Sequence, residues 1–178
     1  MALKDNRKRA RSEAEKEARM QAILAAARDM IGESGFDGVT MAGLARRAGL
    51  AKGTLYLYVR TKEELFLALF VAAMEDFLVR FEAEARAETL VEDLTRLARE
   101  VPLFLPLYAR LTAVIEVAVS GAALFAAKRR IGALSARFIA HLARLSGADE
   151  GRAAEVGQAL MLTMQGAAQF DITARRPQ

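Results

Sequence analysis

Apolar residues along this chain recur at every third or fourth position, and no stretch alternates in the two-residue period of a β-strand. The pattern predicts long helices over about residues 13–33, 62–86, 90–100, 107–119, 122–145 and 149–170. A pair of shorter helices is predicted inside the segment from Thr40 to Val59. We therefore expect an all-α fold, without strands and without internal repeats.

The segment from Thr40 to Val59 carries the signals of two helices joined by a tight turn. Thr40 can cap the first helix, because its side-chain oxygen can accept a hydrogen bond from an unpaired backbone N–H. Gly49 stands where that helix must end, in a left-handed conformation that glycine adopts at little cost. Two helices that cross over such a turn form the helix-turn-helix unit that reads DNA. An ordinary helical hairpin is the alternative.

Helix starts and stops are marked elsewhere in the chain as well. Three pairs have the spacing of a capping box: Ser12 with Glu15, Thr61 with Glu64, and Thr89 with Glu92. Gly35 and Gly147 are placed to end helices. Pro102 and Pro106 are expected to break the helical path, since each lacks an N–H and disfavours helix at the preceding residue.

The composition indicates a sizeable hydrophobic core, and the distribution of charge indicates a class of binding partner. The chain has 178 residues, 53% of them hydrophobic, and no cysteine, so a sizeable core can form without disulfides or thiolate metal sites. Residues 1–62 contain 13 Lys and Arg against 7 Asp and Glu, a net +6, whereas residues 63–178 contain 13 against 15, a net −2. The basic half holds the helix-turn-helix candidate, which favours a polyanionic partner. A solvated basic face without a partner is the alternative.

We expect three segments: a basic flexible arm over residues 1–12, a DNA-binding domain over 13–77, and a regulatory and dimerisation domain over 78–178. The arm could lie along phosphates, enter the minor groove, or serve only solubility. The charged N-terminus is not followed by an apolar run, and the apolar stretches are short or interrupted by charge and proline. We expect a cytoplasmic protein without a signal peptide or a membrane span.

The text ILAAARDMIGESGFDGVTMAGLARRAGLAKGTLYLYVRTKEELFLAL, residues 23–69, resembles the tetracycline-repressor (TetR) family of bacterial transcriptional regulators. The GTLYLYV and KEEL portions are the most specific. The resemblance implies an all-helical homodimer, in which three N-terminal helices bind DNA and a larger helical domain dimerises and usually holds an inducer. It also implies a repressor that releases DNA when ligand moves the two reading heads apart.

The resemblance assigns roles to individual residues. Thr40 matches a capping position that often touches phosphate, and Lys62 matches a phosphate-contacting lysine. Base or phosphate contacts are expected at the start of the reading helix, at Lys52, Gly53 and Thr54. The motif has two aromatic positions, Tyr56 and Tyr58, of which one usually reaches phosphate. Core packing is the alternative for both tyrosines.

Two positions depart from the family pattern, and one of them bears on specificity. A polar or larger residue is commoner at Leu57, and phenylalanine is usual at Val59. Leu57 cannot make a hydrogen bond to a base, although it could contact a thymine methyl group. Lys52 and Thr54 are then the main candidates for contacting base edges. We expect specificity to depend substantially on phosphate positioning, groove shape and two-fold spacing.

The second half offers candidates for a ligand pocket and for a dimer interface. Methionine and aromatic side chains make adaptable apolar walls, and the candidates are Phe104, Leu107, Tyr108, Leu111, Phe125, Phe138, Met161 and Met164. Plain core packing is the alternative. Glu116 interrupts an apolar run and needs a partner if buried, either an arginine or lysine or a cationic ligand. We expect an isologous homodimer through residues 122–145 and 149–170.

The favoured function is a ligand-responsive repressor that binds a palindromic operator on double-stranded DNA and responds to a small apolar or amphipathic inducer. The alternative is a constitutive or architectural DNA-binding dimer without an inducer. A helical enzyme is disfavoured, because the sequence has no glycine-rich phosphate loop, nucleophile elbow or histidine cluster. His141 is the single histidine and has no partner at ligand spacing. We expect neither a metal nor a cofactor.

Overall fold

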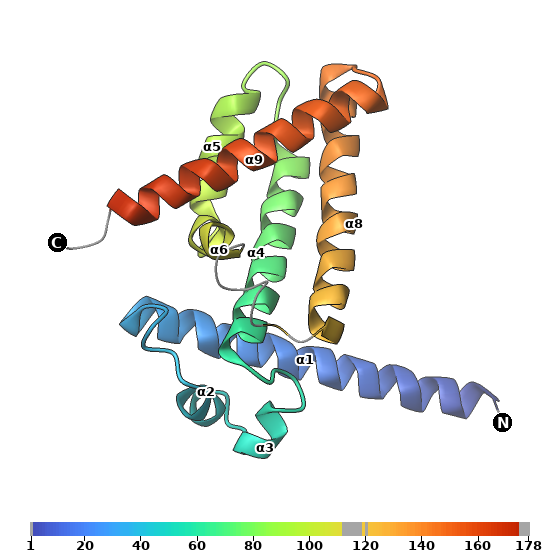
Figure 1. Cartoon of the computed structure of the whole chain (residues 1–178). Helices are drawn as coiled ribbons and strands as arrows, with labels where there is room; N and C mark the ends of the chain where they lie inside the picture. The colour runs from blue at the N-terminus through green and yellow to red at the C-terminus, as the bar shows by residue number, and fades with distance from the viewer. Residues whose placement is uncertain (1, 112–118, 120, 175–178) are drawn as a thin grey trace. The chain divides into compact units, whose positions relative to one another are not determined.

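The computed structural model describes residues 2–111, 119 and 121–174, and within these ranges it contains helices and no strand. The helices are α1 (Ala2–Ser34), α2 (Met41–Arg47), α3 (Lys52–Leu55), α4 (Lys62–Glu84), α5 (Leu90–Glu100), α6 (Phe104–Arg110), α8 (Gly121–Ser146) and α9 (Glu150–Ala174) (Figure 1). The all-α prediction is confirmed. None of these helices is long and apolar enough to cross a membrane.

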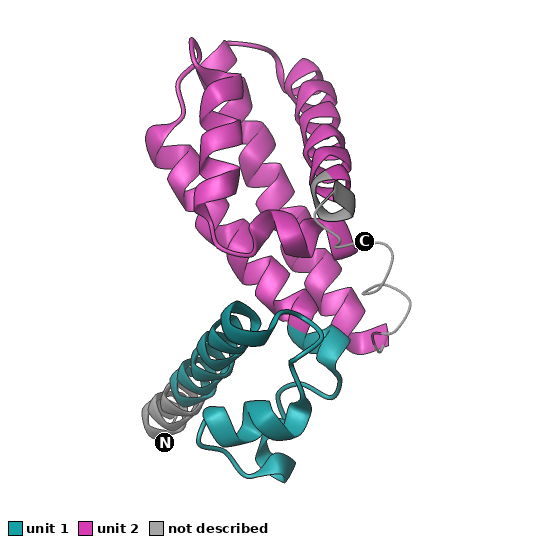
Figure 2. Cartoon of the chain, turned by 90° about the vertical axis from the view of Figure 1, so that its left-hand side faces the viewer, with its two compact units in different colours: residues 1–65 teal, residues 66–178 magenta. Residues whose placement is uncertain are grey.

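The chain divides into two compact units, Met1–Leu65 and Phe66–Gln178 (Figure 2). Helix α4 begins in the first unit and continues into the second. The sequence placed the domain boundary after residue 77, inside this same helix. The helical pattern of α4 is continuous, so it contains no turn signal that could mark the boundary.

In unit 1, α1 packs against α2, and α2 packs against α3. Helix α1 begins at Ala2, where we expected a flexible arm as far as residue 12. The segment 2–12 contains no glycine or proline and is rich in alanine, leucine, lysine and arginine, which favour helix. Gly35 ends helix α1, as the sequence predicts. Gly35 adopts φ +70°, and its N–H donates to Ile31 O at 2.9 Å.

In unit 2, ion pairs join α4 to α8, and α9 packs against both α6 and α8. Arg130 pairs with Glu75. Two helical turns further along both helices, Arg137 pairs with Glu82 at 2.7 Å. Because both pairs follow the same order along the chain, α4 and α8 are parallel (Figure 1).

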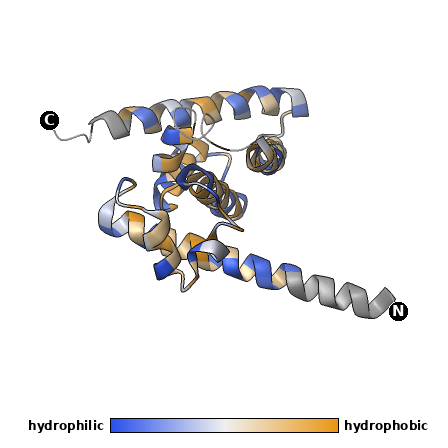
Figure 3. Ribbon diagram, turned by 60° about the horizontal axis from the view of Figure 1, so that its bottom comes forward, coloured by the Kyte–Doolittle hydropathy of each residue, from blue (hydrophilic) through white to orange (hydrophobic). Residues whose placement is uncertain are grey.

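Helices α8 and α9 approach closely at Gly157. A Cβ atom at this position would lie 3.1 Å from Ile139 Cγ1. Helix α9 carries both hydrophilic and hydrophobic residues along its length (Figure 3). Helix α9 continues to Ala174, beyond its predicted end at residue 170.

Three of the predicted helix start and stop signals act differently from the prediction. Ser12 lies inside α1, which begins at Ala2, so the Ser12–Glu15 pair does not mark a helix start. Pro106 lies in the first turn of α6 instead of breaking it, because an N–H at that position has no helical partner to lose. Thr89 precedes α5, yet its side chain makes no capping bond; its hydroxyl donates to Asp93 Oδ2 at 2.7 Å. The Thr89–Glu92 capping box is therefore wrong, because the nearer acceptor in the helix is Asp93.

Candidate DNA-binding surface and ligand cavity

Helix α2 has the capped start and left-handed end that the sequence predicts. The Gly43 N–H donates to Thr40 Oγ1 at 3.1 Å, so Thr40 is the N-cap. Gly49 adopts φ +68°, and the chain reverses there with Leu50 N–H donating to Ala45 O at 2.9 Å. This pair of features is a Schellman motif, which fixes the direction in which the chain enters α3.

The inward side of α3 is fully buried, and its other side is open. Leu55 and Val59 are 0% and 2% exposed. The regular helix is short, Lys52–Leu55, and the chain continues in tight turns, with Tyr58 N–H donating to Leu55 O at 2.9 Å. The buried leucine and valine therefore fix which residues of this segment face outward.

Six of the predicted DNA-binding residues lie on this segment. Lys52, Gly53, Tyr56 and Leu57 are exposed, whereas Thr54 and Tyr58 are half-buried. Leu57 is 84% exposed, which is unusual for a leucine beside a packed core. The Lys52 ammonium lies 5.9 Å from the centre of the Tyr56 ring, so the two side chains share one patch.

Thr40 and Lys62 lie outside that patch in sequence and have other structural partners. The Thr40 oxygen is used by the cap described above. Lys62 Nζ donates to Asp37 O at 3.4 Å. Next to it, Thr61 Oγ1 caps α4 by accepting from Glu64 N–H at 3.1 Å, and Glu64 Oε2 accepts from Arg60 N–H at 2.8 Å.

Two neighbouring arginines at the end of α2, which the sequence analysis did not single out, have different surroundings. Arg47 forms two hydrogen bonds of 2.7 Å to Glu33 of α1. These bonds lower the pKa of the Glu33 carboxyl and raise the pKa of Arg47. Arg46 is exposed on the same unit. Sequence alone could not separate the two arginines, since the difference depends on which one faces Glu33.

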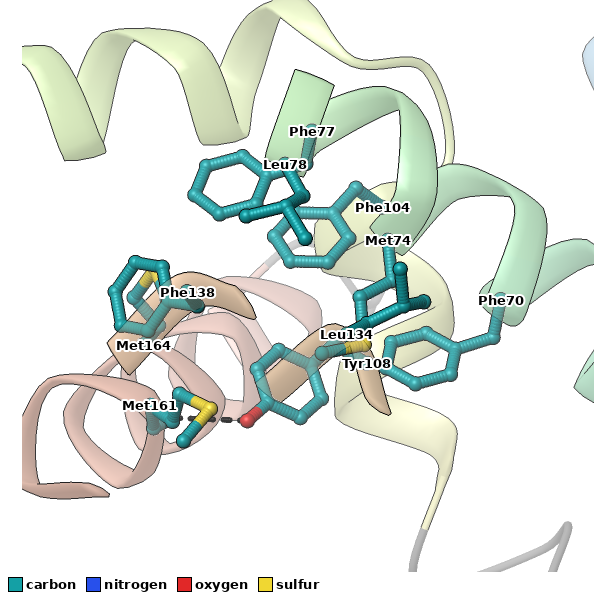
Figure 4. Close-up of a pocket in the computed structure, with 10 residues that line it drawn as sticks. All are labelled: Phe70, Met74, Phe77, Leu78, Phe104, Tyr108, Leu134, Phe138, Met161 and Met164. Carbon is teal, nitrogen blue, oxygen red and sulfur yellow. Dashed lines mark hydrogen bonds between the residues drawn. The ribbon is translucent and has the colours of Figure 1, made fainter. Parts of the chain in front are cut away.

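Unit 2 contains a small apolar cavity with a volume of about 20 Å³ (Figure 4). Side chains from α4, α6, α8 and α9 line it, and all of them are aromatic, leucine or methionine: Phe70, Met74, Phe77, Leu78, Phe104, Tyr108, Leu134, Phe138, Met161 and Met164. This volume is close to that of a single water-sized sphere. A larger ligand could enter only if side chains moved.

The aromatic side of the cavity is organised around Phe104, which is 2% exposed. Its ring stacks on Phe77 with centroids 4.7 Å apart and on Phe70 with centroids 6.1 Å apart. Tyr108 contributes a polar atom, but its hydroxyl already donates to Met161 O at 3.1 Å (Figure 4). Burial raises the pKa of Tyr108.

Five of the eight predicted ligand residues meet at this cavity: Phe104, Tyr108, Phe138, Met161 and Met164. The structure does not bring the other three to it. Leu107 is 0% exposed in the core, Leu111 is half-buried, and Phe125 is 66% exposed. The sequence analysis missed the α4 wall, although residues 70, 74, 77 and 78 have the spacing of one helical face.

The remaining candidates are an acid and a histidine. Glu116 lies outside the described residues. His141 is 8% exposed and packs edge-on against Phe81, with ring centroids 5.3 Å apart. Its Nδ1 atom contacts Arg144 Nη2 at 2.9 Å, and Nε2 has no hydrogen-bond partner in the described structure. Burial, followed by the charge of Arg144, lowers the pKa of His141.

These features define a helix-turn-helix protein whose second unit is a helical domain with an apolar cavity. The model of bacterial regulatory proteins of the tetR family matches residues 23–69, and the model of the tetracyclin repressor-like C-terminal domain matches residues 64–175. The chain belongs to the tetR family of bacterial regulatory proteins.

Individual relatives agree with this assignment. The fatty acid metabolism regulator protein of Bacillus subtilis (strain 168) is 32% identical over 71 residues, which are 40% of this chain and 37% of that protein. The chain thus matches well under half the length of that curated relative.

Solved structures of two FadR regulators share the fold. FadR from Bacillus halodurans has a TM-score of 0.54 at 19% identity, over 89% of this chain and 87% of its own. FadR from Bacillus subtilis in complex with stearoyl-CoA has a TM-score of 0.53 at 20% identity, over 86% and 87%.

Proposed function

We propose that this chain is a DNA-binding transcriptional regulator that acts as a ligand-responsive repressor in the bacterial cytoplasm. The observation that carries the proposal is the exposed face of α3, held outward by the buried Leu55 and Val59 on a capped helix-turn-helix. Family membership supports the same function, and supports a regulator over a helical enzyme.

On this proposal, the exposed residues of α3 meet the major groove and its phosphates. Lys52 can donate to a guanine edge or to phosphate, and Tyr56 can donate to phosphate. Thr40, Gly53, Thr54, Leu57, Tyr58 and Lys62 complete the proposed contact set. Of these, Leu57 offers only apolar contact, as to a thymine methyl group.

The test is selection of bound DNA from a random pool, followed by titration of the selected fragment at several salt concentrations. We expect a palindrome. Lys52→Ala should weaken binding at least tenfold and reduce the salt slope by about two, because each subunit of the proposed dimer loses one phosphate-directed cation. Arg86→Ala removes one positive charge from an exposed position in unit 2, outside α8 and α9, and should change neither quantity. Equal behaviour of the two variants would contradict the proposed surface.

The proposed dimer uses the outward faces of α8 and α9. Phe125 on α8 is 66% exposed and Leu162 on α9 is 61% exposed, so large apolar side chains are uncovered on both helices. An isologous interface would bury each of them against the second copy. Light scattering should give a dimer for the wild type and a smaller mass for Leu162→Glu. A wild-type monomer at micromolar concentration would refute this interface.

The proposed inducer is a small apolar or amphipathic molecule that enters the cavity of unit 2. The cavity wall offers only apolar surface and a tyrosine hydroxyl that is already bonded. The structure of FadR from Bacillus subtilis is a complex with stearoyl-CoA, which supports a ligand with a long acyl chain. Methionine side chains in the wall can rearrange to admit such a chain.

A constitutive DNA-binding dimer without an inducer is the second candidate, and the small volume of the cavity, about 20 Å³, favours it. The two functions differ in a simple measurement. A ligand-responsive repressor should melt at a higher temperature with a suitable amphiphile and should release DNA on adding it. A constitutive binder should show neither effect with any amphiphile tested.

A further inference from the structure

An open groove of about 450 Å³ lies on unit 2 between α5, α6 and α9. Its walls are mostly apolar or small, and it contains a single charged residue: the lining is Thr95, Ala98, Arg99, Leu105, Met164, Ala167, Ala168 and Phe170. Phe170 is 80% exposed at its edge. The groove therefore combines apolar surface with one cation, which is the surface that an anionic amphiphile matches.

Arg99 and Arg96 both lie on α5, but their side chains have different partners. Arg96 is held by three carboxylates, with Asp93 at 3.1 Å, Glu84 at 3.0 Å and Glu100 at 3.3 Å. Asp93 first, then the other two, raise the pKa of Arg96. The Arg99 side chain forms no hydrogen bond or ion pair within the described part of unit 2. Its guanidinium, with five donors, is the cation of this helix that can receive an anion.

Met164 lies between the groove and the apolar cavity, because it lines both. It lines the cavity together with Phe138 and Met161, and it also lines the groove together with Arg99. A methionine side chain has three rotatable bonds and no branch, so it can swing at small cost. Movement of this one side chain would join the two spaces, and the opening would lead from the cation to an entirely apolar interior.

We propose that the groove is the entrance for an alkyl chain that ends in a carboxylate, with the head group at Arg99 and the chain beyond Met164 in the cavity. This inference rests on the proposed ligand-responsive function and specifies its ligand. The head must stay outside, because the polar group of the cavity, the Tyr108 hydroxyl, is already bonded to Met161 O. A carboxylate pairs with a guanidinium through two parallel hydrogen bonds.

The experiment is calorimetric titration of the full chain, without DNA, with dodecanoate and with dodecanol. The wild type should prefer dodecanoate at least tenfold, because the charge-assisted bonds to Arg99 are lost with the alcohol. Arg99→Gln should bring the two affinities within about twofold of each other. Arg129→Gln, which removes the same charge from an exposed position on α8, should keep the wild-type preference.

A second variant tests the connecting side chain. Met164→Phe, with folding checked by circular dichroism, should weaken both ligands about tenfold while keeping the preference for dodecanoate. The inference is overturned if neither ligand binds, if Arg99→Gln keeps the preference, or if Met164→Phe binds both ligands as the wild type does.

DNA binding is measured separately, so that the two proposals can fail separately. If dodecanoyl-CoA releases the operator but dodecanoate does not bind, the proposed repressor remains and the carboxylate site is wrong. If dodecanoate binds through Arg99 but no DNA fragment is bound by the chain, the site remains and the proposed repressor is wrong.

Discussion

Adding one methyl group to Gly49 and to Gly53 should change the stability of unit 1 in opposite directions. Both glycines have open space around the position of a new Cβ, with no atom within 4 Å, so steric clash plays no part. They differ in backbone conformation. Gly49 has φ +68°, whereas Gly53 lies within α3 and has no positive φ.

The backbone conformations of Gly49 and Gly53 determine how much each substitution should change the free energy of unfolding. A left-handed conformation costs an alanine about 1–2 kcal/mol, so Gly49→Ala should lose that amount. An alanine in a helix is favoured over glycine by about 0.5–1 kcal/mol, so Gly53→Ala should gain the lower part of this range in so short a helix. The two variants should therefore differ by about 2 kcal/mol in the free energy of unfolding.

Urea unfolding followed by circular dichroism measures this difference, and operator binding measures the consequence for function. Gly49→Ala molecules that remain folded should bind DNA as the wild type does. Gly53→Ala should bind more weakly despite its greater stability, because its methyl group stands on the proposed DNA-facing side of α3. Equal unfolding midpoints would refute the left-handed turn, and unchanged DNA affinity of Gly53→Ala would refute the proposed contact.

Three further predictions concern packing and titration. Gly38→Ala should lose about 1–3 kcal/mol of stability in urea unfolding, because the new Cβ would lie 2.7 Å from the backbone oxygen of Ser34. Phe104→Ala should lose about 3–5 kcal/mol by the same measurement, since the ring is 2% exposed and stacked on two others. The pKa of His141 is below its ordinary 6.5 when folded, so the unfolded chain binds more protons and stability should fall as pH drops below about 6.5. His141→Phe should flatten this dependence between pH 7.5 and 5.5.

Features set by neighbouring residues could be predicted from the sequence. The Thr40 cap, the left-handed Gly49 and the Thr61 cap each depend on a few adjacent residues, and the structure has all three. The Thr89 signal failed although it is equally local. Asp93 lies one residue beyond the expected Glu92 and accepts a hydrogen bond from the Thr89 hydroxyl, so a competing acceptor decided the outcome.

Which side chains of a helix face the cavity could be predicted from the sequence only in part. A stripe of methionine and phenylalanine shows that a face is apolar, but not which neighbour covers it. Phe125 and Phe138 both belong to α8, yet one is 66% exposed and the other is 3% exposed at the cavity. Helix α4 is apolar on several sides, so its spacing did not show that Phe70 and Phe77 would face the cavity.

The exposed chemistry of α3 limits how the proposed regulator can recognise its operator. The four exposed residues of this segment supply one cation, one phenol, a glycine and a leucine, and Thr54 and Tyr58 add half-buried hydroxyls. A bidentate base contact discriminates by about 1–3 kcal/mol, and Lys52 is the single exposed cation of this segment that could donate to a guanine. Such a face supplies little base-specific energy per half-site. The remaining specificity would have to come from phosphate positioning, groove shape and the spacing that the proposed dimer of α8 and α9 imposes on two copies of α3.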